Sequence, residues 1–173
     1  AKELGLDFFS TPFDETAVQF LETLDVPLYK IASIEIIDLP LIKMVAETGK
    51  PMIISTGTAT IAEIAEAVEA ARGGGCEDLT LLVCTSAYPA NPSDAHLRRI
   101  PNLKEIFGVS VGISDHTLGI GVSVAAVALG ATVVEKHFTL KRSDGGVDSE
   151  FSLEPTEMMQ LVKESNSASV ALG

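Results

Sequence analysis

Six short apolar runs in the sequence each end on polar residues that can take part in chemistry. The runs occupy residues 8–11, 29–33, 52–56, 81–86, 111–116 and 133–137. Continuous stretches of Val, Ile and Leu are typical of buried parallel strands, because helices cover both faces of such a sheet. Polar residues at the carboxyl end of every strand gather at one edge, where (β/α) barrels and open α/β sheets build their active sites. The pattern therefore indicates an α/β enzyme.

Segments with helical periodicity separate these runs. The clearest covers residues 60–72, where Ile61, Ile64 and Val68 fall on one face and the segment ends at consecutive glycines. Strand–helix alternation of this kind predicts right-handed crossovers and a parallel sheet. The remaining helices are predicted over residues 15–24, 39–47, 97–107 (interrupted by Pro101), 119–129 (apolar all round, hence deeply packed) and 156–172.

The spacing of the predicted strands favours a closed barrel. Successive strands begin 20 to 30 residues apart, close to the roughly 31 residues per unit of an eight-fold barrel. The alternative, an open doubly wound sheet, usually carries a glycine-rich phosphate loop after its first strand, whereas residues 73–75 follow a helix. We therefore predict a (β/α)8 TIM barrel, represented by about six of its eight units (strands 3–8). The missing initial Met predicts that residues 1–173 are a partial barrel domain of a longer protein.

Composition narrows the function classes. The chain carries 12 basic and 24 acidic residues, a net charge of -12, which argues against nonspecific nucleic-acid binding. No apolar run approaches the roughly 20 residues of a membrane span, and no signal peptide is visible. Cys76 and Cys84 are too few for a disulfide framework. We expect a cytoplasmic enzyme with neither nucleic-acid nor membrane partners.

Two histidines follow consecutive predicted strands. His116 and His137 should therefore lie on adjacent strands of one rim, and two neutral imidazoles this close suit a divalent transition metal, with water or substrate oxygens in the other positions. The alternative is that each His only caps its strand. Asp115 is expected to be a ligand or the acceptor that orients an imidazole, and His96 to be exposed.

A lysine and several hydroxyls suggest an anion site on the same rim. Lys30 lies within a buried strand, which is costly unless the ammonium is paired, so it is either an anion clamp or a Schiff-base lysine. Glu35 follows closely and could stabilise a cationic carbon or position water. Asp148, in a loop after the last strand, could hold a sugar hydroxyl or be a solvated turn residue. Hydroxyls of a phosphate cradle are offered by Thr11, Ser33, Ser55, Thr56, Ser86 and Ser114.

These pieces, in this order, resemble the sialic acid synthase family, that is, the N-acetylneuraminate, legionaminate and pseudaminate synthases. Seven motifs in register carry the resemblance and span nearly the whole chain. They are Ser10-Thr11-Pro12-Phe13, Tyr29-Lys30-Ile31-Ala32-Ser33, Ser55-Thr56-Gly57, Cys84-Thr85-Ser86 with Tyr88-Pro89, Ser114-Asp115-His116-Thr117, Glu135-Lys136-His137-Phe138, and Asp148-Ser149 with Phe151-Ser152-Leu153.

The resemblance implies a transferase that condenses phosphoenolpyruvate with an open-chain N-acetylated hexose, giving a nine-carbon 2-keto acid and phosphate. A divalent metal, Mn²⁺ first and Mg²⁺ or Co²⁺ as alternatives, would be held by His116 and His137 and would polarise the sugar aldehyde. Glu35, Lys30 and His116 would be catalytic. Tyr88 and Asp148 match sugar-contacting positions. The positions that hold the phosphate and carboxylate of phosphoenolpyruvate match Thr11, Lys30, Ser33, Ser55, Ser86 and Ser114.

The chain also departs from the family pattern. The family has two further strands before the position of Ala1 and a C-terminal antifreeze-like domain, and its members form homodimers. Ser86 stands where neuraminate synthases tend to have Asn. This departure favours the pseudaminate branch, with N-acetylneuraminate or legionaminate synthase as the alternatives.

Three other functions stay open on the sequence. One is a phosphoenolpyruvate-dependent keto-acid synthase that uses an aldose phosphate, which would need a second phosphate site. Another is a Schiff-base aldolase acting through Lys30. The third is a non-catalytic sugar- or metal-binding fragment.

Overall fold

The computed structural model describes residues 1–173 except the side chain of residue 2. The chain divides into two compact units, residues 1–81 and 82–173. Five strands follow the order β1-β2-β3-β4-β5 in the sheet. This order matches the order along the chain, as expected for part of a (β/α)8 barrel.

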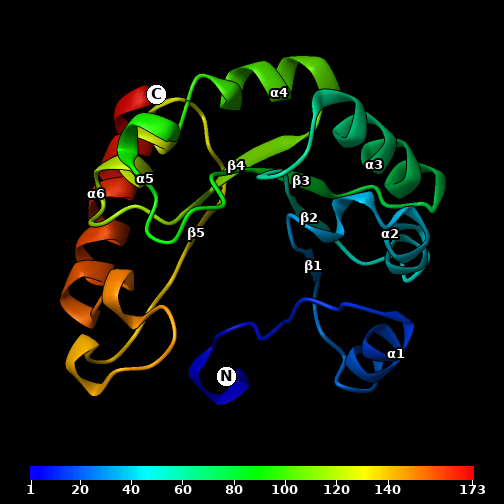
Figure 1. Cartoon of the computed structure of the whole chain (residues 1–173), viewed down its shortest axis with the longest axis horizontal. Coiled ribbons are helices and arrows are strands. Elements are labelled where there is room, and N and C mark those ends of the chain that lie inside the picture. The colour runs from blue at the N-terminus through cyan, green and yellow to red at the C-terminus, as the bar shows by residue number, and fades with distance from the viewer. The chain divides into compact units, whose positions relative to one another are not determined.

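The first unit alternates strands and helices. β1 pairs in parallel with β2, with Tyr29 opposite Met52, and α2 packs against α3 (Figure 1). The core contains Ile31, Ile42 and Ile54, each with no exposed surface. Its elements are η1 (Lys2–Leu4), α1 (Glu15–Thr23), β1 (Tyr29–Ile31), η2 (Glu35–Ile37), α2 (Leu39–Ala46), β2 (Met52–Ser55), α3 (Ile61–Gly73) and the first residues of β3 (Leu79–Cys84).

Local sequence signals explain where these helices begin. The Asp14 carboxylate accepts a hydrogen bond from the Ala17 amide at the start of α1. Thr60 and Glu63 form a reciprocal capping box at the start of α3, which satisfies two amides that lack partners within the helix. The helices over residues 15–24, 39–47 and 60–72 are thus confirmed to within two residues.

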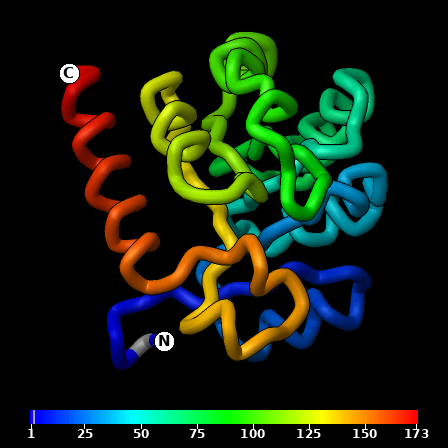
Figure 2. The backbone as a smooth tube through the Cα atoms, turned by 60° about the vertical axis from the view of Figure 1, so that its left-hand side comes forward, coloured from blue at the N-terminus to red at the C-terminus, as the bar shows by residue number. Residues whose placement is uncertain are grey.

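The second unit continues the same alternation. β4 and β5 pair in parallel, with Ser114 opposite Glu135, and α5 packs against α6. Figure 2 shows the orange loop that connects β5 to the long helix α6. The elements are the end of β3, η3 (Pro92–Asp94), α4 (Arg99–Phe107), β4 (Ser110–Asp115), α5 (Gly121–Ala128), β5 (Val134–Lys136), η4 (Arg142–Asp144), η5 (Ser149–Phe151) and α6 (Pro155–Leu172). Among the described residues, no helix combines the length and apolarity that crossing a bilayer requires.

The parallel α/β architecture is confirmed, but the strand predicted over residues 8–11 is wrong. These residues form neither strand nor helix, and Phe8 and Phe9 are 53% and 38% exposed. A strand is defined by hydrogen bonds to a neighbour, and within the described residues this run joins no ladder. The sheet therefore has five strands rather than six.

Two helix predictions also need correction. α4 begins at Arg99, so Pro101 lies in its first turn, where a missing N–H costs no helical hydrogen bond and causes no break. α5 is only half-buried: Ser123, Ala126 and Val127 face inward, while Leu129 just beyond its end is 41% exposed. An apolar sequence did not bury this helix on all sides, because only one of its faces is packed against β4 and α6.

Gly112 in β4 is a position where we expect any side chain to be destabilising. A Cβ atom there would lie 2.8 Å from Leu82 Cδ2 and 2.9 Å from Val133 Cβ, and closer still to the Val133 carbonyl oxygen. Because a backbone oxygen cannot move aside cheaply, Gly112→Ala should lower the free energy of unfolding by about 1–3 kcal/mol. Urea unfolding measures this change. Gly121→Ala is the matched control, since nothing lies within 4 Å of its added Cβ; equal effects of the two substitutions would contradict the argument.

Candidate functional site

In the first unit, the ends of β1 and β2 bring together part of the predicted anion site. Lys30 is 7% exposed, and its ammonium donates to the Ile31 carbonyl oxygen at 3.2 Å. The Ser33 hydroxyl accepts from the Gly57 amide at 3.0 Å, and the Thr58 hydroxyl donates to the Ser33 carbonyl oxygen at 2.7 Å. The segments after the two strands are therefore held against each other.

Among the described side chains of this unit, two polar atoms are buried without a hydrogen-bond partner. They are the Ser55 hydroxyl oxygen and Oε2 of Glu35, which opens η2. Buried polar atoms almost always have partners, and leaving one without costs free energy. These two atoms are therefore suited to contact a bound ligand, in line with the predicted roles of Ser55 and Glu35. Thr11, also predicted, lies partly buried in the segment before α1.

In the second unit, the two predicted metal ligands lie side by side. The ring centroids of His116 and His137 are 5.2 Å apart. Tyr88 lies over His116 with a centroid distance of 4.1 Å, and Phe151 is 5.0 Å from His137. Four rings thus cluster beyond the ends of β4 and β5.

The surroundings of both imidazoles favour the neutral form, which is the form that binds a metal ion. Burial lowers the pKa of His116. Burial also lowers the pKa of His137, and repulsion from His116 adds to this effect. Nδ1 of His116 is 3.1 Å from the Thr85 carbonyl oxygen. A carbonyl only accepts hydrogen bonds, so Nδ1 carries the proton and the Nε2 lone pair remains available for a ligand.

The donor set fits a metal ion only if further ligands come from outside the chain. No group of three or more His, Cys, Asp or Glu side chains among the described residues is arranged to hold a metal ion. Two neutral imidazoles leave several coordination positions for water or substrate oxygens, which is an accepted arrangement for divalent transition metals. The residues present therefore agree with the predicted pair of ligands, His116 and His137.

The predicted role of Asp115 is wrong. Its carboxylate lies 3.0 Å from the Lys136 ammonium and accepts from the Thr117 amide at 2.8 Å and from the Ser123 hydroxyl at 2.5 Å. Burial raises its pKa, but these hydroxyl and amide donors and Lys136 outweigh burial, so the pKa lies below the ordinary value. The carboxylate is fully used inside the protein and neither binds metal nor orients His116, whose orienting acceptor is the Thr85 carbonyl.

Ser114 and Ser86 have surroundings that the sequence did not predict. The Ser114 hydroxyl donates to the Glu135 carboxylate at 2.5 Å. Glu135 belongs to the Glu135-Lys136-His137-Phe138 motif, but the sequence predicted no role for it; the only signal was an acidic residue inside an apolar strand. Ser86 is exposed, with its hydroxyl 4.0 Å from Cys84 Sγ.

The two predicted sugar contacts lie beside the histidine pair. Oδ2 of Asp148 is 3.9 Å from Nδ1 of His137, and Asp148 itself has a left-handed backbone with a φ of 65°. The Tyr88 ring is half-exposed, and burial of its hydroxyl raises its pKa. A polar ligand that reached the two imidazoles would therefore meet a phenol and a carboxylate next to them.

Known proteins show the family to which the chain belongs. The family model described as the NeuB family matches residues 1–173, so the chain is a member of the NeuB family. The pseudaminic acid synthase of Helicobacter pylori is 44% identical over 173 residues, which are 100% of this chain and 51% of that protein. The N,N'-diacetyllegionaminic acid synthase of Campylobacter jejuni is 43% identical over 175 residues, covering 100% of this chain and 52% of its own length.

A solved structure gives the same result for the fold. The crystal structure of N-acetylneuraminic acid (sialic acid) synthetase from Leptospira borgpetersenii, in complex with citrate, matches with a TM-score of 0.96 and 38% identity, covering 99% of this chain and 60% of that one. The chain spans about half the length of the curated relatives that it matches. The predicted family is thus confirmed, and pseudaminic and legionaminic acid synthases are nearly equal in identity.

Proposed function

We propose that this chain belongs to a synthase that condenses phosphoenolpyruvate with an N-acetylated amino sugar, forming a nonulosonic acid and releasing phosphate. The observation that carries the proposal is the pair of neutral imidazoles 5.2 Å apart, flanked by Tyr88, in a chain whose relatives are named nonulosonic acid synthases. The site offers what an aldehyde-activating centre needs, namely two metal ligands with a phenol and a carboxylate beside them.

The roles of the residues in the first unit follow from charge and hydrogen-bonding capacity. The buried ammonium of Lys30 would offset the negative charge of phosphoenolpyruvate, and the hydroxyls of Ser33 and Ser55 would donate to its oxygens. The Glu35 carboxylate would stabilise positive charge that develops on carbon 2 when carbon 3 attacks the sugar aldehyde. Water then adds at carbon 2, and the resulting tetrahedral adduct loses phosphate by cleavage of the C–O bond.

The roles in the second unit concern the sugar. His116 and His137 would hold the divalent metal, with Mn²⁺ proposed and Mg²⁺ or Co²⁺ as the alternatives. When bound, the metal supplies Lewis-acid polarisation of the aldehyde. Tyr88 and Asp148 would hydrogen-bond the sugar and orient its aldehyde, and Ser114, tied to Glu135, would contact the phosphoenolpyruvate anion.

The acceptor that we propose is the sugar of the pseudaminate branch, because Ser86 differs from the Asn expected in neuraminate synthases. The test is phosphate release from phosphoenolpyruvate by the natural full-length protein with Mn²⁺. Three sugars are compared: N-acetylmannosamine, 2,4-diacetamido-trideoxymannose and 2,4-diacetamido-trideoxyaltrose. We expect release with the altrose derivative. Release with another sugar would reassign the branch, and release with none from folded, metal-loaded protein would overturn the proposal.

A further inference from the structure

The segment between β5 and α6 is a loop whose base is closed by backbone hydrogen bonds. The Leu153 amide donates to the His137 carbonyl oxygen at 2.8 Å, and the Thr139 amide donates to the Leu153 carbonyl oxygen at 2.9 Å. These two bonds hold Leu153, at the end of the loop, against residues 137–139, where the loop begins. Residues 140–152, here called the 140–152 loop, include Asp148.

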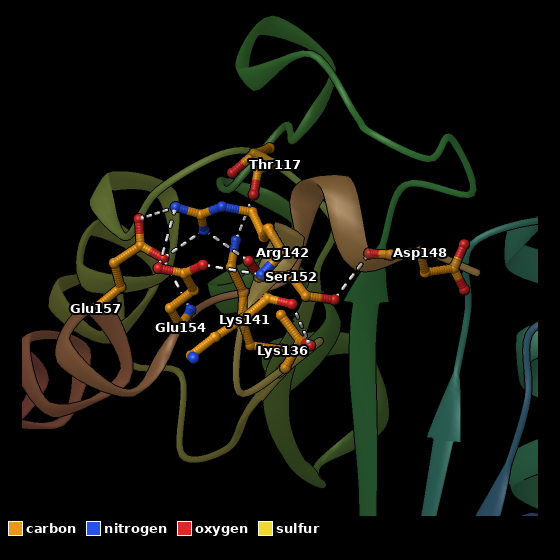
Figure 3. Close-up of polar contacts among 9 residues, drawn as sticks. Thr117, Lys136, Lys141, Arg142, Asp148, Ser152, Glu154 and Glu157 are labelled. Atoms are coloured by element: carbon orange, nitrogen blue, oxygen red, sulfur yellow. Dashed lines mark hydrogen bonds and ion pairs between the residues drawn. The ribbon is translucent and has the colours of Figure 1, made fainter. Parts of the chain in front are cut away.

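Arg142 fastens this loop to the first turn of α6. Its guanidinium donates to both oxygens of Glu157, at 2.5 and 3.0 Å, and to the Ser152 carbonyl oxygen at 2.9 Å. Its amide donates to Oε1 of Glu154 at 2.9 Å. Figure 3 shows the guanidinium beside the Glu157 and Glu154 carboxylates and Ser152. A planar fork with two parallel bonds to a carboxylate fixes orientation as well as distance.

One hydrogen bond extends this arrangement to Asp148. The Ser152 hydroxyl donates to the Asp148 carbonyl oxygen at 2.8 Å, as the dashed line in Figure 3 shows. Phe151, next to Ser152, is 5% exposed and contacts the His137 ring. Continuous contacts thus lead from α6 through Arg142 and Ser152 to Asp148, and from there to His137.

The tip of the loop is held by short-range backbone hydrogen bonds, from the Gly145 amide to the Arg142 carbonyl oxygen at 3.1 Å and from the Ser149 amide to the Gly146 carbonyl oxygen at 3.4 Å. Gly145 and Gly146 have positive φ angles of 74° and 114°, and Val147 is 94% exposed. Glycines lose the most conformational entropy on ordering, so the position of Asp148 depends on contacts made elsewhere in the loop. Of these, the Arg142 bonds to Glu154 and Glu157 are the charged ones.

We propose that Arg142 is a positioning residue for the sugar substrate, which acts by holding the 140–152 loop so that Asp148 stays beside the histidine pair. The proposal rests on the proposed function, in which Asp148 contacts the amino sugar. Arg142 lies on the far side of Ser152 from Asp148, so it acts through the loop and is not itself a sugar contact. Its removal should therefore change sugar binding selectively.

The first test compares Arg142→Met and Arg142→Lys with wild type in the phosphate-release assay. We expect Arg142→Met to raise the KM for the sugar by about 10- to 100-fold, because small misplacements of binding groups have effects of this size. The KM for phosphoenolpyruvate should stay within about twofold. The KM of Arg142→Lys for the sugar should lie between those of wild type and Arg142→Met, since lysine keeps the charge but cannot make the paired bonds to a carboxylate. The control is Lys50→Met, which removes an ion pair to Glu22 of the first unit.

A second measurement does not depend on turnover. In Arg142→Met, exchange of the hydrogen-bonded loop amides of Asp144, Gly145 and Ser149 should accelerate by about tenfold or more, since these bonds lie in the loop that Arg142 orders. The melting temperature should change by only a few degrees, because the ion pair is half-exposed. Unchanged exchange, or a parallel rise of both KM values with a large loss of stability, would overturn the proposal. If no sugar is turned over, the proposed function fails, and exchange alone then decides whether Arg142 orders the loop.

Discussion

Replacing Lys136 by methionine should lower the free energy of unfolding by about 3–5 kcal/mol, because it leaves a buried carboxylate without its counter-charge. The Lys136 and Asp115 side chains are 2% and 0% exposed, and their charged atoms are 3.0 Å apart. The Lys136 ammonium also donates to the Thr117 carbonyl oxygen at 2.5 Å, so the substitution would leave this carbonyl without that donor as well. Chemical denaturation of wild type and variant measures the difference.

The double substitution Asp115→Asn with Lys136→Met separates charge from packing. Removing both charges should recover part of the loss, because neutral groups are cheaper to bury than one unpaired ion. Lys104→Met, on α4 near Gly108, is the control for losing a lysine outside such a pair and should change stability by less than about 0.5 kcal/mol. A loss below about 1 kcal/mol in Lys136→Met would show that the pair does not hold β4 to β5.

His116→Ala should remove Mn²⁺ binding almost completely. If His116 and His137 are the two protein ligands, as proposed, loss of one leaves a single imidazole. Removing a residue that only hydrogen-bonds a metal ligand already lowers metal affinity by roughly 10–100-fold. We therefore expect His116→Ala to lower Mn²⁺ affinity by more than about 100-fold. Calorimetric or electron paramagnetic resonance titration of the protein with Mn²⁺ measures this, independently of any substrate. His137→Ala should behave in the same way.

His96→Ala is the matched control for this experiment. His96 is exposed and lies outside the ring cluster, so its removal should leave Mn²⁺ affinity within about twofold. Equal loss of affinity in His96→Ala and His116→Ala would show nonspecific binding. Full affinity in both His116→Ala and His137→Ala would place the metal elsewhere.

The sequence predicted the architecture well where a single rule dominated. Continuous apolar runs identified β1 to β5, and consecutive glycines marked the end of α3. The same rule failed at Phe8 and Phe9, because hydrophobicity alone does not provide a pairing neighbour. It also overstated the burial of α5, because an apolar helix is covered only where other elements reach it.

The candidate site was predictable in part. His116 and His137 could be paired because consecutive parallel strands place their ends side by side, and the ring distance confirms this. The role of Asp115 could not be predicted. Whether its carboxylate contacts a metal, an imidazole or Lys136 depends on which side of β4 the carboxylate lies, and the sequence does not show this. The bonds of Arg142 could not be predicted from the sequence, since its partners Glu154 and Glu157 lie at the start of α6 and only the folded loop brings them together.

The most direct test follows the bridging oxygen of phosphoenolpyruvate. The natural full-length protein is incubated with Mn²⁺, the altrose-derived sugar and phosphoenolpyruvate labelled with ¹⁸O between carbon 2 and phosphorus, and both products are analysed by mass spectrometry. We expect phosphate release that requires the sugar, with the label in phosphate and a nine-carbon keto acid as the other product. Release without sugar, or label retained in the organic product, would contradict a synthase that works by C–O cleavage.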